Sequence, residues 1–65
     1  MLITINGNQE KVESTTLQSL VSEFDIDVNQ VAVEHNGDII PRTQFGYVAL
    51  SKGDTVELVE FVGGG

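Results

Sequence analysis

Three consecutive glycines, Gly63, Gly64 and Gly65, end the sequence and form the pattern best suited to a chemical role. Glycine has no Cβ and a permissive backbone, so a run of glycines can enter a narrow channel that excludes larger residues. Such a segment can present the carboxylate of Gly65 inside another protein. The simpler interpretation is a flexible end without a role. Under either interpretation we predict one domain, with a globular part over residues 1–62 and a flexible tail over residues 63–65.

The other candidate constellations lack the residues that a catalytic or metal site needs. Residues 25–29 begin like a calcium-binding loop, but Gln30 and Asn36 stand where that loop requires glycine and glutamate. His35 is the single histidine and the chain has no cysteine, so the usual zinc ligand sets cannot form. Phosphate-binding and dinucleotide-binding fingerprints are also missing from the sequence. We therefore expect no catalytic residue, no metal and no bound cofactor, and a protein that is not an enzyme.

The composition favours a small carrier or adaptor. A chain of 65 residues buries only about 60% of the surface that its unfolded form exposes, which leaves little room for a deep active site. Lys and Arg number 3 against 10 for Asp and Glu, and a net charge of −7 disfavours binding to nucleic acids and anionic membranes. This charge suits a partner with a basic face, or it simply keeps a free monomer soluble. The sequence shows no signal peptide or membrane-spanning stretch, so we expect a cytoplasmic protein.

Strand patterns flank a single helical pattern. Residues 1–6 alternate, with Ile3 and Ile5 on one face; Gly7-Asn8 is a turn dipeptide, and residues 9–13 form the returning strand. A helix is predicted from residue 16 to 24 or 25, with Thr15 and Gln18 as a capping box. Its apolar residues recur at the i, i+3, i+4 and i+7 spacing of one helix face: Leu17, Leu20, Val21 and Phe24. A helix this short is unstable alone and must pack against the sheet.

The second half of the sequence adds three more strands. Residues 31–35 and Ile39-Ile40 flank an Asn36-Gly37 turn, and residues 56–61 form the last strand. Residues 42–50 are predicted as loops, anchored to the core by Phe45, Val48 and Leu50. The helix joins two strands that cannot be hairpin partners, so a right-handed crossover places it across one face of the sheet. This order predicts an α+β, ubiquitin-like β-grasp fold, with a mixed sheet of four to five strands.

The last predicted strand has two unlike faces. Val56 and Leu58 should point into the core, which by alternation places Glu57, Val59 and Phe61 on the open face. Exposed apolar side chains beside the tail are typical of a docking site, and Glu57 and Glu60 are placed to pair with arginines of a partner. Alternatively, Phe61 folds back onto the sheet edge and the two glutamates form an ordinary solvated surface.

Three short segments follow one another at a specific spacing. In order, the segments are Val33-x-x-Asn36-Gly37-x-x-Ile40-Pro41-Arg42-x-x-Phe45, Gly53-Asp54-x-Val56-Glu57 and Val62-Gly63-Gly64-Gly65. Each segment alone is common, whereas their order over the full length of the chain is much more specific. In this order the sequence resembles the ThiS family of thiamine-biosynthesis sulfur carriers. Members of that family are β-grasp proteins, like ubiquitin and the small subunit of molybdopterin synthase.

The resemblance implies a chemical role for Gly65. In the family, the terminal carboxylate is adenylated with ATP by a ThiF-like adenylyltransferase, and a sulfurtransferase or cysteine desulfurase provides the sulfur of a thiocarboxylate. That group donates sulfur to a ThiG-like thiazole synthase. Gly63 and Gly64 would pass through the partner's active site, and ATP would be used by the partner without binding to this chain. Three alternatives stay open: a molybdopterin-synthase small subunit, a ubiquitin-like modifier of lysines, and a structural domain with a flexible end.

Overall fold

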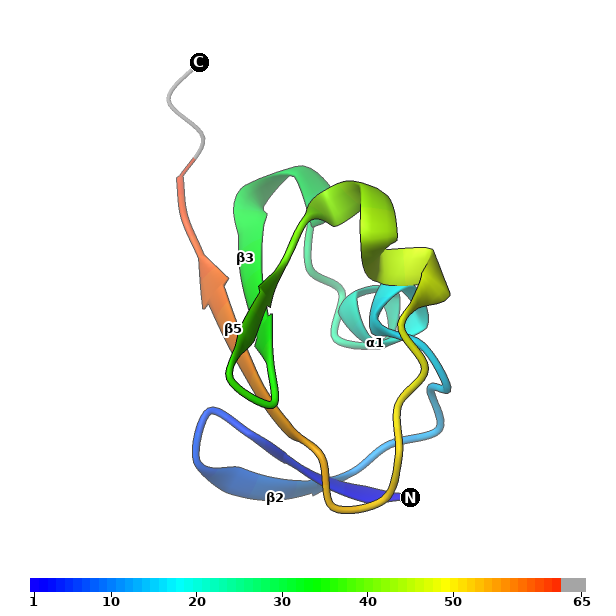
Figure 1. The fold of residues 1–65 in the computed structure, drawn as a ribbon. Coiled ribbons are helices and arrows are strands. Elements are labelled where there is room, and N and C mark those ends of the chain that lie inside the picture. The colour runs from blue at the N-terminus through cyan, green and yellow to red at the C-terminus, as the bar shows by residue number, and fades with distance from the viewer. Residues whose placement is uncertain (63–65) are drawn as a thin grey trace.

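The computed structural model describes residues 1–62, and they form one sheet with helices on one side (Figure 1). The elements are β1 (Leu2–Ile5), β2 (Asn8–Lys11), α1 (Leu17–Glu23), η1 (Val28–Gln30), β3 (Val31–His35), β4 (Asp38–Ile40), η2 (Arg42–Tyr47) and β5 (Thr55–Glu60), where η denotes a 3₁₀ helix. Gly63–Gly65 lie outside the described residues, and the prediction of a flexible tail lies there with them. No helix within residues 1–62 is long and apolar enough to cross a bilayer.

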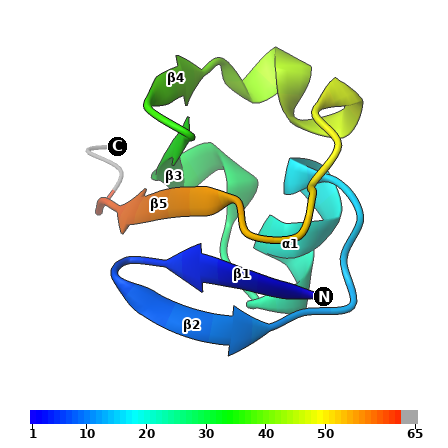
Figure 2. The same cartoon turned by 60° about the horizontal axis from the view of Figure 1, so that its bottom comes forward.

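The sheet has five strands in the order β2-β1-β5-β3-β4 (Figure 2). β5 lies in the centre, parallel to β1 and antiparallel to β3, and the two hairpins β1–β2 and β3–β4 occupy the two edges. The mixed sheet with one main helix confirms the predicted β-grasp fold. The first and last strands of the chain are therefore neighbours in the sheet.

Asparagine–glycine pairs make both hairpin turns. Asn36 and Gly37 have φ of 49° and 91°, as the sequence predicted for this dipeptide, and Asn6 and Gly7 have φ of 49° and 84°. The first turn therefore begins one residue before the predicted Gly7-Asn8 turn. A two-residue turn of this kind needs positive φ at both central positions, and asparagine and glycine are the residues that adopt it most readily.

The start of α1 differs by one residue from the prediction. The capping box is formed by Thr16 and Ser19, since the Ser19 amide donates to Thr16 Oγ1 at 3.1 Å and the Thr16 amide donates to Ser19 Oγ at 3.1 Å. The prediction of Thr15 and Gln18 was therefore wrong. The carbonyl of an N-cap residue accepts the first hydrogen bond within the helix. The Thr15 carbonyl instead accepts a hydrogen bond from the Leu50 amide at 2.8 Å. Phe24 caps the C-terminus of the helix and is partly exposed, so the buried stripe is limited to Leu17, Leu20 and Val21.

The core lies between α1 and one face of the sheet. It contains twelve buried apolar side chains: Ile3, Ile5, Val12, Leu17, Leu20, Val21, Val31, Val33, Phe45, Leu50, Val56 and Leu58. Phe45 and Leu50 anchor the segment between β4 and β5 as predicted, with Val48 packed partly against them. That segment is not only loop, because Arg42–Tyr47 forms η2. Pro41 precedes it in an extended conformation, and its carbonyl accepts from the Gln44 amide at 2.9 Å, which closes the first 3₁₀ turn and brings Phe45 into the core.

Two carboxylates hold the connections between elements. Glu23 at the end of α1 accepts hydrogen bonds from the Ser14 hydroxyl and from the Glu13 and Ser14 amides, and these bonds lower its pKa. Asp54 lies 2.8 Å from His35 Nε2 and accepts from the Ser51 amide at 2.8 Å. Burial disfavours the charged form of Asp54, but the bond with His35 and the other donors outweigh it, so the pKa of Asp54 lies below its usual value.

Replacing Asp54 by alanine should reduce stability in a pH-dependent way. We expect Asp54→Ala to lower the free energy of unfolding by about 1–2 kcal/mol at neutral pH, because the Ser51 amide and the side chains of His35 and Asn36 lose a charged hydrogen-bond partner. A lowered folded-state pKa stabilises the fold above the unfolded-state value of about 3.9, and this contribution disappears as pH falls through the folded-state value. Urea denaturation over a pH series should therefore show the gap to wild type narrowing below about pH 4.

Glu13→Ala provides the matched control, because it removes an exposed carboxylate that accepts no hydrogen bond among residues 1–62. Its effect on the free energy of unfolding should lie within about 0.5 kcal/mol at every pH. The assigned role of the Asp54 carboxylate would be contradicted by one result. That result is a difference in the free energy of unfolding between wild type and Asp54→Ala that stays constant from neutral pH to pH values below the folded-state pKa.

Candidate functional site

β5 carries the chain from the core to the glycine tail. Its outer half is held on the β1 side by Asn6, whose side chain replaces a neighbouring strand where the β1–β5 pairing ends. Asn6 Oδ1 accepts from the Leu58 amide at 2.8 Å and Asn6 Nδ2 donates to the Leu58 carbonyl at 3.0 Å. On the β3 side, the Phe61 amide donates to the Gln30 carbonyl at 3.0 Å. The backbone is thus held as far as Phe61, only two residues before the glycines.

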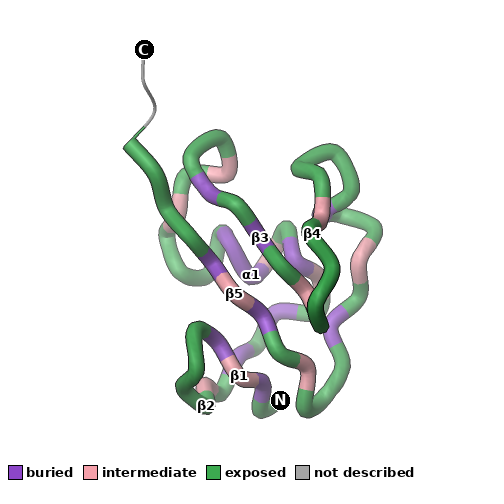
Figure 3. Tube along the Cα trace, turned by 60° about the vertical axis from the view of Figure 1, so that its left-hand side comes forward, coloured by how far each residue is buried: buried purple, intermediate pink, exposed green. Residues whose placement is uncertain are grey.

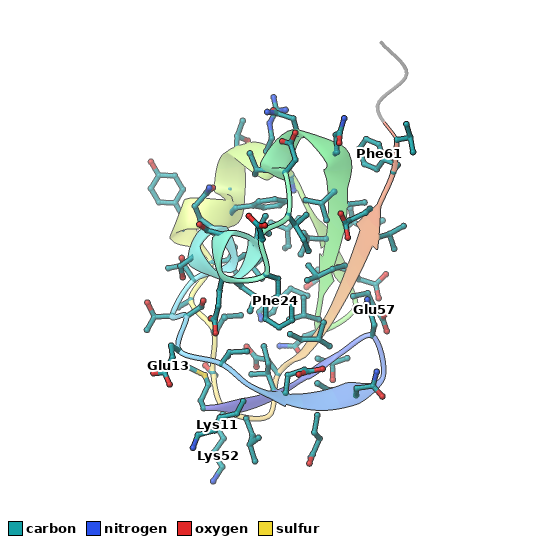
Figure 4. All side chains as sticks on the ribbon, turned by 180° about the vertical axis from the view of Figure 1, so that it is seen from behind. Lys11, Glu13, Phe24, Lys52, Glu57 and Phe61 are labelled. Carbon is teal, nitrogen blue, oxygen red and sulfur yellow. The ribbon has the colours of Figure 1, made fainter. Side chains whose placement is uncertain are left out.

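The two faces of β5 differ as the alternation predicted. Val56 and Leu58 are buried in the core, Glu57 is half-buried, and Val59 and Phe61 are 59% and 49% exposed. Figure 3 shows this change of burial along the strand. The regular strand ends at Glu60, and Phe61 follows it near the far end of the molecule (Figure 4). Three apolar side chains next to the tail, Val59, Phe61 and Val62, remain without cover in the described part of the chain.

The two glutamates predicted to flank this patch do not share a face. Glu60 lies opposite Val31 in the β3–β5 register, so it belongs to the face that α1 covers, at the outer end of the strand. Glu57 lies opposite Glu34 on the open face. Strict alternation separates residues three apart, and the expectation that both glutamates border one apolar patch is therefore corrected to Glu57 alone.

A shallow groove of about 190 Å³ lies on the open face, over β3, β4 and β5. We call it the open-face groove, and it is lined by Ala32, Val33, Glu34, Ile39, Glu57 and Val59. Ile39 is 78% exposed and was not predicted as a surface residue of the site. The sequence did contain a signal for Ile39, namely the Asn36-Gly37 turn. A two-residue hairpin turn at this position pairs Ile39 with Glu34 and thus places both on the face opposite the core.

The basic side chains lie away from this groove. Lys11 and Lys52 lie together at the end of the molecule opposite Phe61 (Figure 4), and Arg42 donates from Nη1 to Asn29 Oδ1 at 2.5 Å. The one contact within residues 1–62 at salt-bridge distance joins His35 and Asp54, and it is an ion pair only when His35 is protonated. Those residues also contain no cluster of three or more His, Asp or Glu side chains that could hold a metal ion. The site therefore has the chemistry of a recognition surface that is apolar and acidic, beside the end of the chain.

The sequence profile of the ThiS family matches residues 2–65, which include all three terminal glycines. The chain is 33% identical to the sulfur carrier protein ThiS of Bacillus subtilis, over 98% of this chain and 100% of that protein. It is 39% identical to a thiazole synthase of Paramagnetospirillum magneticum, over 100% of this chain. The chain spans only about a fifth of the length of that thiazole synthase and of a second one, from Magnetococcus marinus.

The fold agrees with a solved member of the same family. A crystal structure of the thiamine biosynthesis protein ThiS from Geobacter metallireducens superimposes with a TM-score of 0.84, at 32% identity and with both chains covered completely. This agreement confirms the resemblance that the spacing of the sequence segments indicated. The match over residues 2–65, the full-length Bacillus relative and this common fold establish that the chain belongs to the ThiS family.

Proposed function

We propose that this protein carries sulfur for the synthesis of the thiazole moiety of thiamine, as a cytoplasmic co-substrate of separate enzymes. The observation that carries the proposal is the family match through Gly65, joined to a fold whose last strand leads directly to the glycines. The Bacillus relative of equal length is named a sulfur carrier protein. In this proposal the chain provides recognition and a reactive end, and its partners provide the catalysis.

The proposed chemistry takes place at the carboxylate of Gly65. A carboxylate oxygen attacks the α-phosphorus of ATP in an adenylyltransferase of the ThiF type, pyrophosphate leaves, and an acyl-adenylate forms. Hydrosulfide, released by a thiol reductant from the persulfide of a sulfurtransferase or cysteine desulfurase, then attacks the carbonyl carbon, and AMP leaves to give the thiocarboxylate. Gly63 and Gly64 pass through the partner's channel, where Gly64 fits because it has no side chain and Gly63 adds reach.

Thiazole synthase is the proposed acceptor of the sulfur. The thiazole synthases of Paramagnetospirillum and Magnetococcus match this chain along its whole length, in a stretch that makes up a fifth of each protein. A carrier-like stretch and a thiazole synthase therefore occur in one polypeptide in those organisms. This association favours thiamine synthesis over the molybdopterin alternative, and rescue of a thiamine auxotroph but not of a molybdopterin-deficient strain would distinguish the two pathways.

The direct test of the proposal is the intact mass of the protein after incubation with ATP, a ThiF-like enzyme and a sulfide source. We expect a gain that corresponds to the exchange of one oxygen for sulfur, located at Gly65. A variant that lacks Gly64 and Gly65 should show no gain. An unchanged wild-type mass, while a known carrier is converted in the same mixture, would contradict the proposal.

The tail variants should separate chemistry from stability. Removal of Gly64 and Gly65 should leave the melting temperature unchanged, because the described contacts of β5 end at the Phe61 amide. Gly63→Ala is the matched control: it lies beyond the minimal pair, so conversion should continue. A tail deletion that destabilises the protein would show that the glycines contribute to the fold, and equal loss of conversion in Gly63→Ala would extend the essential segment.

Phe61→Ala should weaken binding to the ThiF-like enzyme by about tenfold or more, because a large apolar side chain beside the reactive end is a typical binding hot spot. The free energy of unfolding should change by less than about 1 kcal/mol, since half of the side chain is already in solvent. Tyr47→Ala is the control, as Tyr47 is 84% exposed but lies on η2. Calorimetric titration and thermal unfolding measure both quantities. Unfolding of Phe61→Ala, or equal loss of binding in Tyr47→Ala, would contradict the placement of the docking site.

A further inference from the structure

Two glutamates face each other on the open side of the sheet. Glu34 on β3 and Glu57 on β5 are directly opposite in the antiparallel register, and both line the open-face groove. Side chains in such a pair have Cβ atoms about 4.5–5.5 Å apart, and like charges at this position destabilise a sheet. The only contact at salt-bridge distance within residues 1–62 is between His35 and Asp54, so neither glutamate has a basic partner there.

The rest of the groove is apolar. Ile39 and Val59 are 78% and 59% exposed and lie on either side of the β3 strand that carries Glu34, and Ala32 completes the surface. The groove therefore combines a pair of carboxylates with apolar walls. A ligand that matches both parts needs a cationic group on an apolar stem.

A metal ion, a nucleic acid and a second copy of the chain each fit this surface poorly. The groove provides two carboxylates, and within residues 1–62 no third ligand completes a metal site. The net charge of −7 repels phosphate backbones and also repels another copy. Of the basic side chains that a second copy could offer, Lys11 and Lys52 lie at the far end of the molecule (Figure 4) and Arg42 donates to Asn29.

We propose that the open-face groove receives an arginine of a partner protein, with the guanidinium between Glu34 and Glu57 and the aliphatic stem against Ile39 and Val59. The planar guanidinium has five donors and can bond two carboxylates at once, whereas a lysine ammonium acts as a point charge. The stem of an arginine buries readily along apolar surface. An arginine between the two glutamates offsets the repulsion between their carboxylates. Binding therefore relieves a destabilising interaction that is present in the free protein.

This inference rests on the proposed carrier function, since the partner is taken to be the enzyme that activates Gly65. It adds a specificity element that is separate from the glycine tail. The tail provides a reactive end that is nearly featureless, and the acidic pair recognises a cation at a fixed position on the sheet. A partner with an apolar contact but no correctly placed arginine would be excluded by two uncompensated carboxylates.

The test uses Glu34→Gln and Glu57→Gln in the full chain, with binding to the ThiF-like enzyme measured by calorimetry and stability by thermal unfolding. Each variant should melt about 1–5 °C higher than wild type, because the like-charge pair is removed. Each should bind about tenfold more weakly, and this difference should shrink as salt concentration rises. Asp38→Asn, next to Ile39 but on the other face, removes the same charge and should change neither property much.

The proposal predicts that each glutamine variant melts at a higher temperature but binds the enzyme more weakly. Loss of a merely structural contact would instead lower both the melting temperature and the affinity. Wild-type binding by both glutamine variants, with thiocarboxylate still formed by wild type, would overturn this inference and leave the carrier function intact. Wild type that is neither bound nor converted would overturn both. A dimer of the free protein in sedimentation experiments, lost in Glu57→Gln, would instead identify a second copy as the occupant and overturn the arginine assignment.

Discussion

Every strand of the sheet connects to β5 directly or through one neighbour, since β5 pairs with β1 on one side and with β3 on the other. One face of this strand is buried through Val56 and Leu58, and the other face carries Glu57 and Val59 into solvent. The same strand therefore completes the core, contributes Glu57 and Val59 to the open-face groove and leads to the glycines. A change that moves β5 would therefore alter the core and the open-face groove together.

The elements with strong local signals could be predicted from the sequence. The stripe on α1, the Asn36-Gly37 turn and the alternation in β5 each depend on a short-range pattern. The turn and the alternation were confirmed, and the stripe was confirmed for Leu17, Leu20 and Val21 but not for Phe24. The helix cap was misplaced because three hydroxyl residues, Ser14 to Thr16, compete for it. Tertiary contacts decide the outcome, as Ser14 bonds Glu23 and the Thr15 carbonyl is taken by Leu50.

The candidate site was predicted in part. Alternation placed Val59 and Phe61 correctly in solvent, because that pattern is a property of β5 alone. Ile39 and Glu34 join the site only through pairing between strands, which single-strand patterns do not contain. For the same reason the opposed pair of glutamates was not foreseen. The pairing register between strands is therefore needed to predict which side chains lie together on the open face.

In the proposed function, partners dock on the open face of the sheet while the C-terminal carboxylate reacts. Methyl NMR of the protein with and without the ThiF-like enzyme tests it most directly, because each face carries its own probes. We predict large shift changes for Ile39 and Val59 on the open face and small ones for Val28 and Val48, which pack on the helix side. Changes concentrated at Val28 and Val48, with Ile39 and Val59 unmoved, would contradict the claim and place the docking surface on the helices.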